Sequence, residues 1–347
     1  MKGSNFWEKA EKPIVASAPM AGVTDAAFRR VMAKYSKYGG SDDPSRDTTS
    51  FGALDVIFTE FVSADGLFLA GKEELADSLS YTEEERPVVA QFFSPDPDRM
   101  KRSAAFAKEL GFDGIDLNMG CPDRAVCKQG AGAEVIKTPE LAQKIIKAAK
   151  EGASDMPVSV KTRAGYFSDS ELNDWITAVL ETEPAALTLH ARTKKDMYKV
   201  PARWDLVKQT VELRDKIKVK TSVLGNGDIS SMEDLYEKVS HSQADGAMVG
   251  RVLFGNPWFF DERKISSGVS VTERLRVLVE HCKLFEDLFA DRKSFALMKK
   301  HYKAYVSGWD GAKELRIKLM TAKSASEVER LVDNYLSEVN IGQQGPF

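Results

Sequence analysis

Short apolar runs alternate with amphipathic segments over residues 14–260 of the chain. Eight of these runs have the length and composition of strands: Ile14–Ala18, Val56–Thr59, Val88–Phe92, Gly114–Asn118, Val158–Lys161, Leu187–His190, Val219–Leu224 and Gly246–Gly250. Strands that are apolar throughout and alternate with helices form parallel sheets that are covered on both faces. Eight such units over roughly 250 residues predict a (β/α)₈ TIM barrel.

The intervening helices are expected over Asp25–Tyr35, Ala64–Leu69, Asp98–Leu110, Pro139–Lys150, Ser170–Leu180, Trp204–Leu213 and Ser231–Val239. A doubly wound open sheet is the main alternative to the barrel. That fold should carry a Gly-x-Gly-x-x-Gly turn after its first strand, where this chain has Pro19-Met20-Ala21-Gly22. The segment Gly39–Gly52 lacks periodicity, and we expect a surface loop there.

The pattern changes after Phe260, because helical segments follow one another without strands between them. They cover Val271–Phe289, Ser294–Val306, Ala312–Met320 and Glu327–Val339. This change predicts a barrel domain over residues 1–265 and a smaller all-α domain over residues 266–347.

The stretch Arg292–Lys323 is strongly basic, with nine Lys or Arg residues against two acidic ones. On a helical wheel the apolar side chains share one face: Phe295, Met298, Tyr302 and Tyr305. Basic side chains gather on another face: Arg292, Lys293, Lys299, Lys300 and Lys303. A solvated surface explains such a face as well as binding to a nucleic-acid backbone does.

Composition excludes several classes of protein. The N-terminus has no apolar core of signal-peptide length, and no stretch could span a bilayer. Three cysteines (Cys121, Cys127 and Cys282) make a disulfide framework improbable and favour a reducing cytoplasm. The formal net charge of -3 favours no particular partner.

Several predicted strand ends carry groups that can bind a ligand. They are the Pro19-Met20-Ala21 turn, Gln91, Asn118 with Cys121, Lys161 with Arg163, His190 with Arg192, Asn226-Gly227-Asp228, and Gly250-Arg251. The carboxyl ends of barrel strands meet on one rim, where ligands bind. Glycines after the last two strands expose backbone N–H groups suited to a phosphate, which Arg251 could also contact. We expect Asp228 to point aside and to cap the helix that follows it.

Three interpretations of Lys161 are possible from the sequence. It could pair with an acid in the barrel mouth, form a Schiff base as in an aldolase, or stabilise a reduced flavin as a nearby cation. The neighbouring amide of Gln91 matches a uracil-like edge and favours the flavin. Cys121 before Pro122 is either a small thiol in a tight turn or a reactive group at the rim.

With these motifs assembled, the chain resembles the tRNA-dihydrouridine synthases, in particular their bacterial type B branch. The resemblance spans nearly the whole chain and rests on these motifs: Ala18–Asp25, Thr59-Glu60, Asn118-Met119-Gly120-Cys121-Pro122, Gly130–Ala133, Val160–Arg163, His190–Arg192, Gly225–Ile229, Val249–Arg251, Phe295–Tyr305 and Gly311–Arg316.

This resemblance implies an FMN-binding barrel and a tRNA-binding helical domain that reduce tRNA uridines with NADPH. It implies that Cys121 is the proton donor. The cofactor-binding residues would be Pro19, Met20, Ala21, Gln91, Lys161, His190, Asn226, Gly227, Asp228, Gly250 and Arg251. The substrate-binding residues would be Asn118, Arg163, Arg192, Arg292, Lys299, Lys300 and Lys303. We expect a cytoplasmic monomer without a metal ion.

Three alternatives stay open on the sequence. A dihydroorotate-dehydrogenase-like flavin enzyme would not need the basic C-terminal helices. An RNA-binding protein could retain FMN without reductase activity. The third alternative is an aldolase that uses Lys161. Two features depart from the family pattern, namely the Gly39–Gly52 insertion and Cys127, whose spacing from Cys121 fits no common zinc motif.

Overall fold

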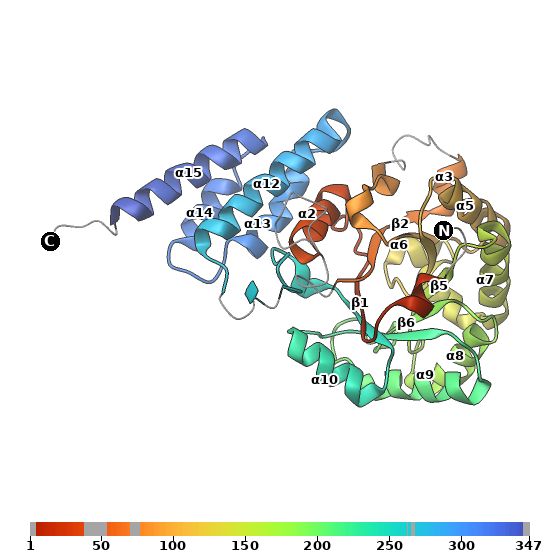
Figure 1. Ribbon diagram of the computed structural model, residues 1–347. Helices are drawn as coiled ribbons and strands as arrows, with labels where there is room; N and C mark the ends of the chain where they lie inside the picture. The colour runs from red at the N-terminus through yellow and green to blue at the C-terminus, as the bar shows by residue number, and fades with distance from the viewer. Residues whose placement is uncertain (1–4, 38–53, 70–76, 262, 265–267, 343–347) are drawn as a thin grey trace. The chain divides into compact units, whose positions relative to one another are not determined.

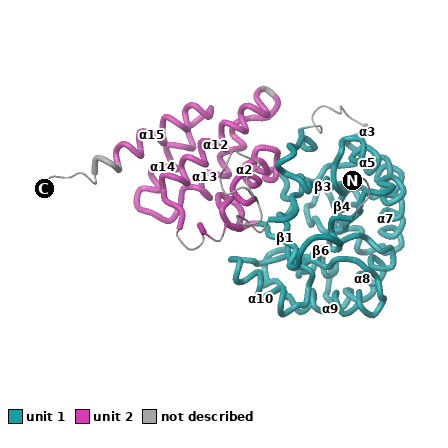
Figure 2. The backbone as a smooth tube through the Cα atoms, in the orientation of Figure 1, with its two compact units in different colours: residues 1–21, 54–250 teal, residues 22–53, 251–347 magenta. Residues whose placement is uncertain are grey.

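The computed structural model describes residues 5–37, 54–69, 77–261, 263–264 and 268–342. The Gly39–Gly52 insertion lies outside the described residues. Contacts divide the chain into two compact units, which are coloured separately in Figure 2. Unit 1 contains residues 1–21 and 54–250, and unit 2 contains residues 22–53 and 251–347.

Unit 1 contains an eight-stranded parallel sheet with the order β1-β8-β7-β6-β5-β4-β3-β2. The strands are β1 (Ile14–Ser17), β2 (Ile57–Ser63), β3 (Val88–Phe93), β4 (Gly114–Met119), β5 (Val158–Arg163), β6 (Ala186–His190), β7 (Ser222–Asn226) and β8 (Gly246–Val249). A parallel bridge between Ala16 and Val56 joins β1 to the start of β2, which closes the sheet. The predicted (β/α)₈ barrel is confirmed.

Helices follow the strands on the outside of this barrel (Figure 1). They are α3 (Ala64–Leu69), α5 (Pro97–Glu109), α6 (Arg124–Lys128), α7 (Pro139–Ala153), α8 (Leu172–Leu180), α9 (Trp204–Ile217) and α10 (Met232–Ser242). The helices α5, α7, α8, α9 and α10 pack side by side in that order. The seventh strand starts later than predicted, because α9 extends to Ile217 and ends on a left-handed Lys218.

The interior of the barrel is apolar toward the amino ends of the strands. Trp7 of α1 (Phe6–Lys9) is 1% exposed and packs with Phe58, Val89, Leu224 and Met248. Side chains two residues apart on a strand share a face. The next inward positions on β3 and β7 are therefore those of Gln91 and Asn226. This apolar floor supports a polar layer at the carboxyl ends of the strands.

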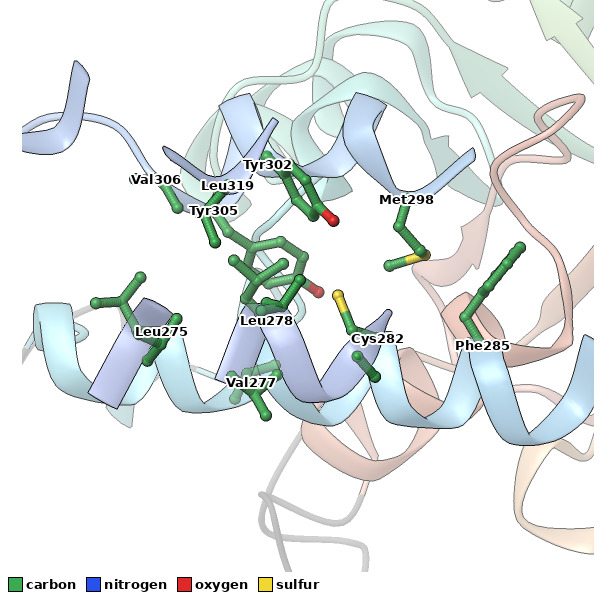
Figure 3. Close-up of a cluster of buried hydrophobic side chains, with 14 of the residues drawn as sticks. Leu275, Val277, Leu278, Cys282, Phe285, Met298, Tyr302, Tyr305, Val306 and Leu319 are labelled. Carbon is green, nitrogen blue, oxygen red and sulfur yellow. The ribbon is translucent and has the colours of Figure 1, made fainter. Parts of the chain in front are cut away.

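Unit 2 is helical. It contains α2 (Ala26–Ser36), α12 (Val271–Phe289), α13 (Lys299–Tyr305), α14 (Ala312–Leu319) and α15 (Ala325–Gly342). Figure 3 shows its core, where Cys282 and Phe285 of α12 lie among side chains that include Met298, Tyr302 and Tyr305. The predicted apolar face of the basic stretch is thus buried, with Phe295 packed against it. Among the described residues, no helix is long and apolar enough to cross a membrane.

Contacts group α2 with the C-terminal helices, although α2 follows the first barrel strand in the sequence. Ala26, Ala27 and Val31 of this helix belong to the same apolar core as α12. The assignment of residues 1–265 to cofactor binding and of residues 266–347 to tRNA binding stays a prediction.

Candidate active site

Strand register brings polar side chains together at the carboxyl end of the barrel. Gln91 of β3 is level with Asp116 of β4, and Asp116 is level with Ser159 of β5. One inward step higher, Asn118 is level with Lys161. The alternation of residues along each strand points these side chains to the same face. The predicted convergence of Gln91, Asn118 and Lys161 agrees with this register.

A chain of hydrogen bonds runs across this layer. Asp116 is fully buried, and its carboxylate accepts from Ser159 Oγ at 2.6 Å and from Gln91 Nε2 at 2.6 Å. Gln91 Oε1 in turn accepts from Asn118 Nδ2 at 3.0 Å. Burial raises the pKa of Asp116 to about 6, against the opposing effects of these hydrogen bonds and of the Lys161 charge.

Asn118 holds the turn that contains Cys121. Its Oδ1 accepts from the backbone N–H groups of Cys121, at 2.9 Å, and of Gly120, at 3.2 Å. Gly132 packs under the same turn with a φ of 61°. The Sγ of Cys127 on α6 lies 3.6 Å from the carbonyl oxygen of Cys121. The thiol of Cys121 therefore lies on a turn that is fixed from two sides.

Burial raises the pKa of the Cys121 thiol above its ordinary value, more than the hydrogen bond from the backbone of Asp123 lowers it. The helix that follows, α6, has only five residues. A raised pKa keeps the thiol protonated at neutral pH, which suits a proton donor better than a nucleophile.

Lys161 is half-buried beside Asn226, whose Oδ1 accepts from its Nζ at 3.2 Å. Among the described residues, no carboxylate forms a salt bridge with it. Burial lowers the pKa of Lys161 to about 8, and the charge of Arg163 adds to this effect. An anionic ligand beside Lys161 would compensate its charge and stabilise the ammonium. Of the first interpretation, an acid partner in the barrel mouth, only an interaction with the charge of Asp116 is found, without a salt bridge.

Arg163 is 2% exposed and joins two loops, the one after β4 and the one after β6. Its Nε donates to the carbonyl oxygen of Gly120 at 2.9 Å, directly before Cys121. Its Nη1 donates to the carbonyl oxygens of Thr193 at 3.1 Å and Met197 at 3.3 Å. These contacts give Arg163 a bracing role next to the thiol.

His190, Arg192 and Asp228 form a second cluster on the rim. Arg192 contacts His190 Nε2 at 3.2 Å and forms a salt bridge with Asp228. Asp228 Oδ2 also accepts from the backbone of Ala202 at 2.9 Å. Asp228 points aside as expected, but the expectation that it caps the next helix is wrong, because Ser231 caps α10. The carboxylate of Asp228 instead compensates the positive charge of the Arg192 guanidinium.

The residues predicted to bind the cofactor phosphate follow β7 and β8, and β1 is the next strand beside β8. A β-carbon on Gly250 would lie 3.5 Å from Ala18 Cβ and 3.9 Å from Met20 Sδ. This places the Pro19–Ala21 turn beside the end of β8. Gly227 has a φ of 125°, which favours glycine. Arg251 is the next residue in the chain after Gly250; it is exposed and begins unit 2.

The predicted tRNA-binding residues lie in unit 2 with differing surroundings. Arg292 and Lys303 are exposed, and Lys299 is half-buried. Lys300 Nζ would lie 3.4 Å from a β-carbon on Gly22. Burial raises the pKa of Asp25, the N-cap of α2, and the charge of Lys300 is among the effects that oppose this rise. Lys300 is therefore held beside the start of α2.

Sequence reasoning missed two parts of the site. Asp116 lies two residues before Asn118 on β4, and Ser159 lies two residues before Lys161 on β5, so each shares the inward face of its strand. The signal in the sequence was Asp116, a charged residue inside an apolar strand. Tyr198 is 55% exposed, with its ring 5.7 Å from the Arg163 guanidinium. Its loop gives no periodic signal.

The fold and site define a (β/α)₈-barrel enzyme with its polar centre at the carboxyl ends of the strands. The sequence model of the family described as "Dihydrouridine synthase (Dus)" matches residues 16–340. The chain therefore belongs to the dihydrouridine synthase family.

Curated relatives agree over almost the whole chain. A protein of Staphylococcus epidermidis named "Probable tRNA-dihydrouridine synthase" is 36% identical over 333 residues, covering 95% of this chain and 96% of the relative. A protein of Bacillus subtilis named "Probable tRNA-dihydrouridine synthase 2" is 34% identical over 334 residues, covering 95% of this chain and 96% of the relative.

Solved structures share the fold at low identity. Histamine dehydrogenase from Rhizobium sp. 4-9 has a TM-score of 0.52 and 16% identity, covering 79% of this chain and 49% of that chain. A 2-naphthoyl-CoA reductase has a TM-score of 0.51 and 10% identity, covering 75% of this chain and 50% of the reductase chain. At these identities the likeness concerns the fold alone.

Proposed function

We propose that this chain reduces uridine in tRNA to 5,6-dihydrouridine, with FMN as bound cofactor and NADPH as electron source. Family membership and the names of the relatives support the reaction. The observation that carries the proposal is the turn of Cys121, which Asn118 fixes through two backbone N–H groups and which follows the strand neighbouring that of Lys161. Burial raises the pKa of this thiol.

The residues at the rim fit FMN. The only hydrogen-bond acceptor of the half-buried Lys161 ammonium among the described residues is the neutral amide oxygen of Asn226. Gly250 carries no side chain next to Ala18 and Met20. Gln91 and Lys161 would hold the ring, with His190 beside it and Pro19, Met20 and Ala21 as lining. The phosphate would bind at Asn226, Gly227, Gly250 and Arg251 and at the backbone of Asp228, whose carboxylate is held by Arg192 and Ala202 N. Bound there, reduced FMN supplies a hydride to C6 of the uracil.

The protein itself supplies the proton. Cys121 Sγ–H gives its proton to C5, and the resulting thiolate is reprotonated from solvent. Because burial raises the thiol pKa, Cys121 starts each cycle protonated. Asn118 and Arg163 fix the turn through Cys121 N and Gly120 O. Arg192 would bind the substrate once the uridine has left its stack.

The helical domain would bind the tRNA backbone through Arg292, Lys299, Lys300 and Lys303, and the protein would act as a cytoplasmic monomer. Lys and Arg side chains on one helical face contact phosphates without reading sequence. The position of the reduced uridine would then depend on how this domain orients the tRNA.

The test uses the purified protein. We expect a yellow protein whose flavin is bleached by NADPH and reoxidised by tRNA from a strain that lacks the gene. A bound flavin that NADPH does not bleach would indicate an RNA-binding protein without reductase activity. Borohydride trapping of a substrate on Lys161 would indicate the aldolase, for which the lowered pKa of this lysine is also suitable.

A further inference from the structure

We propose that Asp116 is a positioning residue whose carboxylate acts through the amides of Gln91 and Asn118 to hold the turn that carries Cys121. This role rests on the proposed function of Cys121 as proton donor. The proposal is supported by the continuous chain of hydrogen bonds from Asp116 through Gln91 and Asn118 to the turn of Cys121.

The first step fixes Gln91. An ionised carboxylate can only accept hydrogen bonds. One oxygen of Asp116 accepts from Ser159 Oγ and the other from Gln91 Nε2, each at 2.6 Å. Gln91 must therefore turn its NH₂ group toward Asp116, which leaves its Oε1 facing Asn118.

The second step fixes Asn118. Because Gln91 Oε1 can only accept, Asn118 must present Nδ2, which lies 3.0 Å away. Its Oδ1 then faces the turn and accepts from the N–H groups of Cys121 and Gly120. A flipped Asn118 would place N–H groups against N–H groups and leave buried polar atoms unpaired, which is costly.

One direction of the whole chain of bonds is thus favoured at its buried end. The hydrogen bonds to Asp116 and the positive charge of Lys161 favour the ionised carboxylate, and a pKa of about 6 leaves it mostly charged at neutral pH. Gln and Asn amides alone could pair in either direction. The carboxylate of Asp116 at one end and the backbone N–H groups of Cys121 and Gly120 at the other end favour the same direction.

This logic predicts a rescue between two substitutions. Asn118→Asp places a carboxylate at each end of Gln91, and the Oε1 of Gln91 must then face one of them. Adding Asp116→Asn allows the bonds to run in the opposite direction: Gln91 Nε2 donates to the carboxylate at 118, and the amide at 116 donates to Gln91 Oε1. Ser159 can donate to the amide oxygen at 116.

The readout is alkylation of the Cys121 thiol by iodoacetamide in the flavin-free, full-length protein, followed by peptide mass spectrometry over a pH series. Plateau rates at high pH are compared, because the thiol is then fully ionised in every variant. Loss of one hydrogen bond of ordinary strength predicts about tenfold faster alkylation in Asn118→Asp. Asp116→Asn and the double variant should stay within about threefold of the wild-type rate.

Equal rates in Asn118→Asp and the double variant, or an unchanged rate in Asn118→Asp, would overturn the proposal. If Asn118→Asp is not soluble, recovery of folded protein in the double variant supports the relay, and an insoluble double variant contradicts it. None of these outcomes involves flavin or tRNA, so they are separate from a failure of the proposed reaction, which the wild-type turnover assay detects.

Discussion

A β-carbon added to Gly132 would lie 2.7 Å from the carbonyl oxygen of Cys121 and 2.8 Å from Val126 Cγ1. The backbone N–H of the next residue, Ala133, donates to the same carbonyl at 2.9 Å. The turn with the thiol thus rests directly on the glycine-rich loop that follows α6. No side chain fits between them.

Gly132→Ala should therefore displace the Cys121 turn. We expect a loss of about 2 to 4 kcal/mol in the free energy of unfolding, from a left-handed alanine and a steric overlap, and a loss of turnover. The matched control is Gly130→Ala, which has a φ of 76° but whose β-carbon would meet only Pro95, at 3.5 Å. Urea unfolding that shows equal losses for both variants would refute the close approach.

Arg163→Lys keeps a positive charge but cannot reach Gly120, Thr193 and Met197 together, since its ammonium lacks the planar fork of the guanidinium. Leaving buried carbonyl groups without donors should cost about 2 kcal/mol in the free energy of unfolding. Cys121 should also become more reactive toward alkylation, because its turn loses the bond at Gly120 O. A variant as stable as the wild type would contradict the bracing role.

Lys161→Met should show a pH signature in flavin-free protein. The folded-state pKa of Lys161 is about 8, below its ordinary value of 10.5. The unfolded chain thus binds more protons between these values, and wild-type stability rises as pH increases from 8 toward 10.5. Below pH 8 the penalty for burying the charge is fully present.

Methionine removes this penalty. The stability of Lys161→Met relative to wild type should therefore be greatest below pH 8 and should decline by about 3 kcal/mol at higher pH. Urea unfolding at several pH values measures the difference. A difference independent of pH would show that Lys161 has an ordinary pKa. The variant should also fail to retain FMN, which absorbance of the purified protein detects.

Lys303→Gln should reduce the salt dependence of tRNA binding by about one unit in the slope of log K against log salt concentration. The matched control is Lys283→Gln, an exposed lysine of α12 that pairs with Glu329 at 2.8 Å. Filter binding at several salt concentrations gives both slopes. An equal change in both variants would mean that net charge, rather than the predicted basic face, determines binding.

Much of the fold could be predicted because its signals are local. Each apolar run of the barrel lies near the observed strand, and Val271–Phe289 matches α12 at both ends. The grouping of α2 with the C-terminal helices could not be predicted from pattern, because its apolar face suits a barrel and a helical core equally. Only packing against residues distant in sequence decides between them.

The site was predictable where a residue type is unusual at a strand end, as for Gln91, Lys161 and Cys121. Asp116 was missed because its role depends on register, which places it level with Gln91 on the neighbouring strand. The raised pKa of Cys121 could not be predicted from the sequence, because burial raises it while the backbone hydrogen bond from Asp123 lowers it, and both depend on the folded turn.

The central claim is that Cys121 donates a proton during reduction of uridine in tRNA. The most direct measurement is the dihydrouridine content, by mass spectrometry, of tRNA from a strain lacking the gene after incubation with NADPH and either wild-type protein or Cys121→Ala. We predict that both proteins retain FMN and that only the wild type forms dihydrouridine. Full activity in Cys121→Ala, or no dihydrouridine with FMN-loaded wild type, would contradict the account.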